Sequence, residues 1–300
     1  MKKIIFLIFL ISLTSLNSQS NIDCNSNLSI FAEYYKVKNF EAAYEPWMSV
    51  RKDCPKINPA IYFQGSRMLE DFIKKSEGEQ KKSYQQDLLK LYDEWLINFP
   101  AYNGRSIVGQ IISNKAQKMI DYKLASNNEI FEIFEKAYQT DPVSFDDPKP
   151  LYNYFKTYFQ LYKQGDNGIT LNQIFNKYEE LSERFNSIID QYSKQIDIII
   201  NKENSGVALT SREKRNKRVY EINSNASNIY LRNLNAIIAK ESTCENLIPL
   251  YKKNLEENKT NPIWLNRAAS RMDSKECSDD PLFVVLVELL HNLNPSANSA

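Results

Sequence analysis

The sequence contains little glycine and a single histidine. There are 7 glycines among 300 residues, and His291 is the one histidine. Because phosphate-binding loops and tight sheet turns rely on glycine, its scarcity argues against a nucleotide-binding loop and against a β-rich fold. One histidine leaves at most one group for triad or histidine–metal chemistry, and we expect His291 to be structural. We therefore predict that the chain is not an enzyme and has no catalytic residue, cofactor or metal site.

The sequence also lacks an apolar run long enough to cross a bilayer. Its most apolar stretch, Ile4–Leu13, follows two lysines and precedes Ser18-Gln-Ser20. This order is typical of a cleaved secretory signal peptide, not of a membrane helix. We predict a signal peptide over residues 1–20, cleaved after Ser18 or Ser20. Cys24 is not preceded by a lipobox, so we expect a soluble mature chain without a lipid anchor, in the periplasm or outside the cell.

Charge of either sign is not in excess. The chain has 38 basic and 37 acidic residues, and removal of the signal peptide takes away two of the lysines. A nearly neutral chain is a poor ligand for nucleic acid, because that binding depends on phosphate neutralisation. We therefore expect neither a nucleic-acid partner nor a membrane span.

What the chain does contain is a series of amphipathic segments of helical periodicity. In the first, Cys24–Pro55, two such segments flank a break at Lys38-Asn39. A small residue among aromatic ones suits an antiparallel helical hairpin, because it lets the two backbones approach. The residues at tetratricopeptide-repeat positions are Tyr34, Phe40, Ala43, Trp47, Val50 and Pro55.

Degenerate copies of this unit follow. Asn58–Pro100 places Gly65 where two helices come close, and polar Ser76–Lys82 looks like a longer connection than the motif allows. Gly104–Pro142 repeats the aromatic, alanine and proline spacing, with Asn127 or Asn128 as the expected cap of its second helix. A shorter pair returns after Thr243, where Trp264 and Ala268 stand four residues apart.

The middle of the chain departs from this length. Apolar residues at three-and-four spacing run from Leu171 to Ile199 and again from Val219 to Ile237, joined by the polar segment Asn201–Ser211. The pattern predicts an antiparallel helical hairpin with arms longer than those of a normal repeat.

The chain resembles exported tetratricopeptide-repeat proteins of the Bacteroidota. The resemblance implies an all-α fold, an α-solenoid in which helical hairpins form a right-handed superhelix. Its first helices would line a concave groove that binds a peptide or protein. We expect TPR-like repeats over 21–165, the elongated hairpin over 166–242, and further, incomplete repeats over 243–300.

Four cysteines bracket two of the expected hairpins. Cys24 and Cys54 enclose the first, and Cys244 and Cys277 enclose the pair near the C-terminus. In an exported protein an even number of cysteines favours disulfides, and this is the one pairing that is local in both halves. Free thiols are the main alternative. A metal site is disfavoured because no Cys-x-x-Cys or nearby histidine supports it.

Two sets of side chains are candidates for binding a partner. Tyr152 and Tyr154 lie at the two edges of an aromatic helical stripe, which otherwise reads as core. Arg212 and Arg215 belong to a basic cluster at the start of the second long arm, which otherwise reads as an exposed helix start. The last helix, residues 281–293, is apolar around most of its circumference, so we expect further chain or a partner to cover it.

These features favour a non-enzymatic scaffold in the cell envelope that binds a protein or peptide through a TPR-like concave surface. Two alternatives stay open. One is a glycan- or nutrient-binding module at the cell surface, since exposed aromatic rings stack on sugars. The other is a regulatory domain of a longer chain that continues past Ala300.

Overall fold

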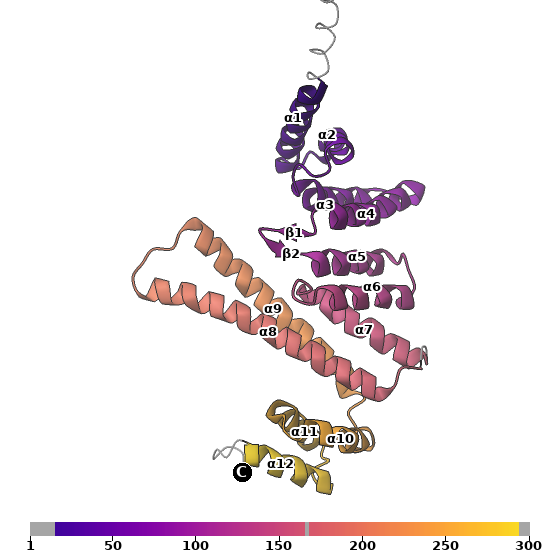
Figure 1. Ribbon diagram of the computed structural model, residues 1–300, viewed down its shortest axis with the longest axis vertical. Helices are drawn as coiled ribbons and strands as arrows, with labels where there is room; N and C mark the ends of the chain where they lie inside the picture. Colours follow the sequence, from indigo (N-terminus) through magenta and orange to yellow (C-terminus); the bar gives the residue numbers. More distant parts are fainter. Residues whose placement is uncertain (1–15, 166–167, 294–300) are drawn as a thin grey trace, which may run out of the picture. The chain divides into compact units, whose positions relative to one another are not determined.

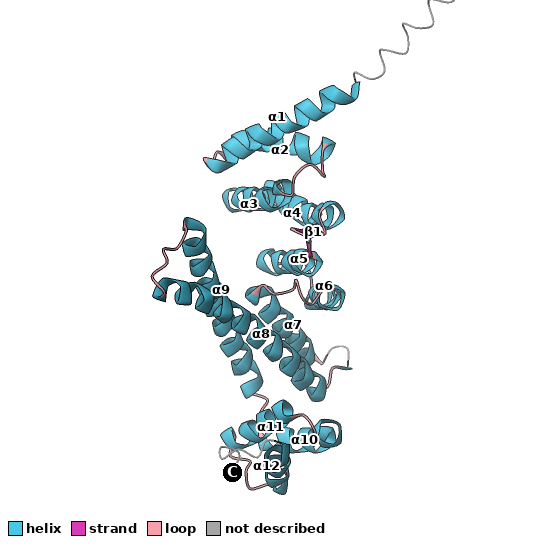
Figure 2. Ribbon diagram, turned by 60° about the vertical axis from the view of Figure 1, so that its left-hand side comes forward, coloured by secondary structure: helices cyan, strands magenta, loops and turns pink. Residues whose placement is uncertain are grey.

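A computed structural model describes residues 16–165 and 168–293 of the chain, with side chains from Cys24 onward. The predicted signal peptide therefore lies almost entirely outside the described residues. The described part is helical apart from one two-stranded hairpin, which confirms the prediction of an all-α fold (Figures 1 and 2). By their internal contacts the residues form two compact units, Met1–Asp147 and Pro148–Ala300, here the N-terminal and the C-terminal unit.

The N-terminal unit, as far as it is described from Leu16 onward, consists of six helices and the small hairpin. In order these are α1 (Leu16–Lys36), α2 (Phe40–Asp53), α3 (Ala60–Lys75), α4 (Gly78–Asn98), β1 (Ala101–Tyr102), β2 (Arg105–Ser106), α5 (Val108–Tyr122) and α6 (Asn127–Thr140). Successive helices pair as α1 with α2, α3 with α4 and α5 with α6. The expected break after α1 is present, with Lys38 at φ 59° and the Asn39 side chain accepting a hydrogen bond from the Ala42 amide at the start of α2.

Trp47 of α2 makes a close contact between the first pair of helices and the second. The Trp47 side chain is fully buried, and its indole Nε1 donates a hydrogen bond of 2.8 Å to the Ile61 carbonyl of α3. A Cβ atom at Gly65 would lie 2.5 Å from that same Nε1. Gly65 therefore allows the close helix approach that the sequence predicted.

Two local expectations are wrong. Ser76–Lys82 is not an inserted loop, because α3 extends to Lys75 and α4 begins at Gly78. Most of these polar residues lie in the exposed first turns of α4. They are polar because they face solvent, and the helix is not interrupted there. The cap of α6 is Ser126 instead of Asn127 or Asn128, since Ser126 and Glu129 form a reciprocal capping box.

The C-terminal unit contains the remaining helices. These are α7 (Pro148–Gln164), α8 (Leu171–Asn204), α9 (Ser211–Ala239), α10 (Cys244–Asn258), α11 (Pro262–Ser274) and α12 (Pro281–Leu293). The two predicted long helices are confirmed as α8 and α9, which lie side by side (Figure 1). Both begin with a capping box, at Thr170 and at Thr210.

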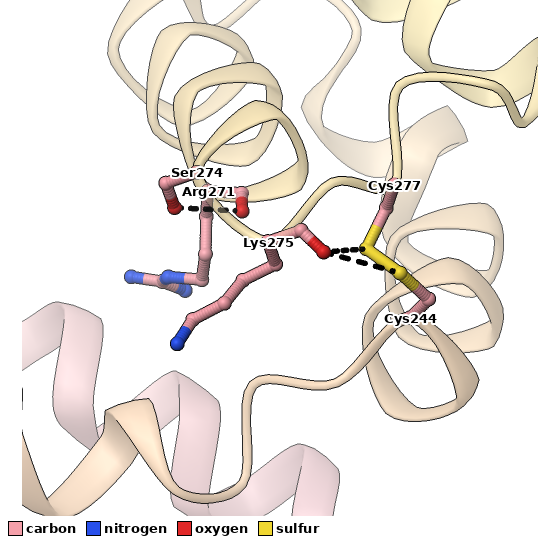
Figure 3. Close-up of a disulfide and its surroundings, with 5 residues drawn as sticks. All are labelled: Cys244, Arg271, Ser274, Lys275 and Cys277. Carbon is pink, nitrogen blue, oxygen red and sulfur yellow. Dashed lines mark hydrogen bonds between the residues drawn. A yellow bond between two sulfur atoms is a disulfide. The ribbon is translucent and has the colours of Figure 1, made fainter.

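Both predicted cysteine pairs are confirmed. Cys24 of α1 is bonded to Cys54, the residue after α2, with Cα atoms 6.2 Å apart. Cys244 opens α10 and is bonded to Cys277 beyond α11, with Cα atoms 5.5 Å apart (Figure 3). The Lys275 carbonyl oxygen lies 3.5 and 3.4 Å from the two sulfur atoms of this second bond. Disulfides persist in oxidising compartments, so these pairs are typical of a chain that matures outside the cytosol.

No helix among the described residues is long and apolar enough to cross a membrane. The longest, α8, packs against both α9 and α7. The expectation of no membrane span therefore holds for the described part of the chain.

We predict that Gly65→Ala destabilises the N-terminal unit by about 1–3 kcal/mol, because the new methyl group overpacks the joint with Trp47. Denaturant unfolding followed by tryptophan fluorescence measures the change. Gln86→Ala, on the exposed face of α4, is the control and should shift stability by less than about 0.5 kcal/mol. Equal stability of the two variants would show that the joint is not tightly packed.

We further predict that Cys244→Ser destabilises the C-terminal unit by about 3–4 kcal/mol, since the bond closes a loop across a sequence separation of 33 residues. Urea unfolding of the oxidised protein and of the variant gives the difference. Reduction of the wild type breaks both disulfides, so it should destabilise the protein at least as much as the variant does. A variant as stable as the oxidised wild type would contradict the prediction.

Candidate functional site

The N-terminal unit contains a pocket of about 560 Å³ between α3 and α5. Its wall on α3 is formed by Phe63, Arg67 and Glu70, and its wall on α5 by Gln110, Asn114 and Lys118. On each helix these residues are three or four positions apart, so each wall is one helix face. Figure 2 shows α3 and α5 as neighbours within this unit.

The two walls are joined by an ion pair. Lys118 Nζ lies 2.9 Å from Glu70 Oε1, and both side chains are largely shielded from solvent. Asn114 donates a hydrogen bond of 2.9 Å to Asp147 Oδ2 at one end of the pocket. Arg67 differs from these residues, because it is exposed and has no ion-pair partner among the described residues. The pocket therefore offers one unneutralised cation.

Aromatic residues of α4 form the floor. The rings of Tyr92 and Trp95 are stacked with centroids 6.0 Å apart, and Trp95 also stacks on Tyr62. Burial raises the pKa of Tyr92, and the negative charges of Glu70 and Asp147 raise it further. Tyr92 thus stays a neutral phenol at all physiological pH values. The Trp95 Nε1 atom is buried and has no hydrogen-bond partner among the described residues.

The small hairpin forms the rim of the pocket. Tyr102 of β1 lines the pocket and is 51% exposed. Ser106 of β2 donates a hydrogen bond of 2.6 Å to the Asp141 carboxylate, which ties the rim to the segment after α6. Gly109 permits this contact, since a Cβ atom there would collide with the Asp141 carbonyl oxygen. The rim is therefore held in place by a polar tether and a close backbone approach.

The sequence-based candidates lie elsewhere, in the C-terminal unit. Tyr154 is fully buried and its hydroxyl accepts a hydrogen bond of 3.0 Å from Lys177, so the expectation that it faces a groove is wrong. Its position at the edge of the helical stripe is covered by α8, which periodicity alone did not show. Tyr152 is half-buried and its ring lies 5.4 Å from that of Tyr230 on α9.

Arg212 and Arg215 are exposed in the first turns of α9, as expected for a helix start. His291, the one histidine of the sequence, is exposed in the last turn of α12. Val284 and Val285 of α12 are also exposed, and the uncovered apolar face predicted for this helix is present. These residues all belong to the C-terminal unit, whereas the pocket belongs to the N-terminal unit.

Sequence reasoning did not identify the pocket residues. The available signal was that Phe63, Arg67 and Glu70 recur at three- and four-residue spacing on the helix that contains Gly65, and so share one helix face. The matching wall on α5 was harder to find, because it combines Gln110, Asn114 and Lys118, which read as an ordinary solvated face.

The chain shows no match to a family model, to a curated protein or to a solved structure. Within residues 16–165 and 168–293, no three His, Cys, Asp or Glu side chains are grouped so that they could hold a metal ion. The side chains of the pocket combine aromatic surface, amide groups, one paired cation and one unpaired cation.

We predict that the rim of the pocket loosens in acid. Burial raises the pKa of Asp141, but hydrogen bonds from Ser106, Ser144 and the Gly109 amide outweigh it, and the net pKa lies below the usual value. A depressed pKa means that the tether is fully present above the usual aspartate range and is lost as pH falls through the folded pKa. Amide NMR signals of residues 101–106 should shift over that acidic range.

Ser106→Ala should produce the same shifts already at neutral pH, because it removes the donor to Asp141. Ser83→Ala, at an exposed position of α4, is the matched control and should leave these signals unchanged. An identical acid titration in wild type and Ser106→Ala would show that Asp141 does not hold the rim.

Proposed function

We propose that the chain is a non-enzymatic, TPR-like scaffold that binds an extended segment of another protein in the pocket between α3 and α5. The observation that carries the proposal is the pair of facing helix walls, Phe63, Arg67 and Glu70 against Gln110, Asn114 and Lys118. Both helices are the first of their pair, which is where a solenoid of helical hairpins presents its concave, binding surface. We include that solenoid arrangement, and the relationship to exported Bacteroidota repeat proteins, in the proposal.

The chemistry of the pocket suits a peptide. Amide groups of Gln110 and Asn114 can hydrogen-bond a backbone, which offers a donor and an acceptor at every residue. The aromatic floor provides apolar area for a side chain, and Arg67 provides a fixed charge beside it. A ligand with regularly alternating backbone groups and varied side chains fits this mixture better than a uniformly polar or uniformly apolar molecule.

The proposed location is the cell envelope or the outside of the cell. Two disulfides support maturation in an oxidising compartment, and the sequence pattern of residues 1–20 supports export. The glycan-binding alternative loses one of its two tyrosines, because Tyr154 is buried. The photo-crosslinking experiment described next can still detect glycan binding.

A photo-crosslinking experiment tests the proposal. A photoreactive phenylalanine derivative replaces Tyr102 at the rim, and in a matched control it replaces Tyr34, which is 40% exposed and lies on α1. After irradiation in cells, we expect discrete protein adducts from the rim position and none of the same mass from the control. Mass spectrometry of the adducts identifies the bound segment.

The double variant Phe63→Ala/Arg67→Glu, made in the rim-labelled protein, should reduce these adducts at least about tenfold, because it removes the apolar wall and reverses the free charge. Circular dichroism checks that the variant is folded. Adducts that persist in the double variant, or equal adducts from both positions, would refute binding in the pocket. Labelled sugar in place of protein would favour the glycan-binding function.

A further inference from the structure

The α9 helix carries two separate rows of side chains at heptad-like spacing. The first row faces α8: Glu213 lies 2.6 Å from Lys202, the Tyr220 ring is 6.0 Å from Tyr192, and Asn235 accepts a hydrogen bond from Tyr178. This row explains the pairing of the two long helices, which run antiparallel.

The second row lies on a different face and is exposed except at Ala226, which is half-buried. Its members alternate three and four positions apart and are Arg212, Arg215, Val219, Ile222, Ala226 and Ile229. The three large aliphatic members are 45%, 55% and 47% exposed, in chain order. Three exposed β-branched residues in one row, on a helix that already has a partner, form an unpartnered seam.

Helix α7 accompanies only the inner end of this seam, at the level of Ala226 and Ile229. It runs parallel to α9, since Tyr152 contacts Tyr230 and Lys163 pairs with Glu241 at 3.1 Å in the same register. It begins at Pro148, about one helical turn before Tyr152, so its first residue is level with the region just before Tyr230. The N-terminal half of α9 extends past that point, as Figure 1 shows. A third helix thus accompanies the base of the hairpin but not its outer half.

Near the tip of the α8–α9 hairpin, the acidic side chains are engaged in ion pairs but two arginines are not. Lys217 pairs with Glu203 at 2.6 Å and Glu213 pairs with Lys202, so the carboxylates nearest the tip are engaged. Arg212 and Arg215 are exposed and have no ion-pair partner among the described residues. The seam therefore begins with two free cations and continues as an aliphatic row.

We propose that the outer half of the α8–α9 hairpin is a docking surface for an acidic amphipathic helix of a partner protein, which would lie along this seam as a third helix. An aliphatic row at three-and-four spacing matches the a and d positions of a packed helix, and flanking charges select the partner. The free arginines select carboxylates. This surface belongs to the C-terminal unit and the pocket to the N-terminal unit, and the proposal does not depend on the function proposed for the pocket.

The seam fits a helix better than a membrane surface. Helices that lie in a bilayer interface need a broad apolar face, usually with aromatic residues. Here the row is one residue wide, and Asn223 and Asn225 flank Ile222 on its two sides. Side chains of a partner helix can pack between the residues of such a narrow row. Acyl chains would cover a wider surface and would contact the polar asparagines as well.

The test uses the full mature chain and a designed helical peptide of about three heptads, with leucine and isoleucine on one seam and glutamate beside it. A second peptide carries lysine in place of glutamate. Fluorescence anisotropy of the labelled peptides should show the acidic peptide binding at least about tenfold more tightly than the basic one. Arg212→Glu/Arg215→Glu should reverse that order.

Val219→Asn/Ile222→Asn should weaken binding of the acidic peptide at least about tenfold, while Ile263→Asn, at an exposed isoleucine of α11, should not change it. All these positions are exposed, and thermal unfolding confirms that the variants fold. Equal binding of both peptides, or an unchanged affinity after Val219→Asn/Ile222→Asn, overturns the proposal.

Two other occupants give distinct results. Binding to anionic vesicles that the seam variant abolishes, without peptide binding, would assign the face to a membrane surface and overturn the proposal. A dimer in sedimentation analysis that dissociates in the same variant would assign it to a second copy of the chain. Loss of pocket crosslinking leaves these results unchanged, so the two proposals fail independently.

Discussion

The contact of Trp47 with Gly65 is the constraint on which the N-terminal unit depends. Helices of this length are marginal alone, and their stability comes from burying one face against a neighbour. The indole of Trp47 is the largest buried side chain, and it reaches α3 only because Gly65 has no side chain and because the Ile61 carbonyl accepts its N–H. Without that hydrogen bond, the buried indole N–H would be unsatisfied and would lower the free energy of unfolding. With it, the indole fixes the orientation of α3 relative to α2.

The same contact sets the pocket. Phe63 and Arg67 flank Gly65 on α3, so the surface that they present is fixed by how α3 sits on Trp47. A second glycine, Gly109, positions the opposite wall by allowing the start of α5 to approach Asp141. Both walls of the pocket are thus placed by residues with no side chain, which explains why so few glycines suffice and why these two occur inside helices.

Sequence periodicity predicted the helices, the first hairpin and both disulfides, because these depend on contacts between residues close along the chain. It failed where a residue's role depends on a neighbour that periodicity cannot reveal. Tyr154 is buried because α8 covers it, and Ser76–Lys82 is helical because exposed helix turns and loops have similar composition. The pocket was missed for a related reason: Gln110 and Asn114 are ordinary surface residues until α3 lies opposite them.

The exposed face of α9 is a second place where periodicity did not reveal which residues are covered. The hairpin was predicted from the apolar row that starts at Val219, but the row that meets α8 has the same spacing and contains Tyr220 and Asn235. The structure resolves the choice through Tyr192 and Tyr178, and it leaves Val219 and Ile222 in solvent. A long helical hairpin needs only one apolar row to hold its arms together. A second row contributes nothing to that pairing and increases the exposed apolar surface, which soluble proteins usually keep low unless the surface serves to bind.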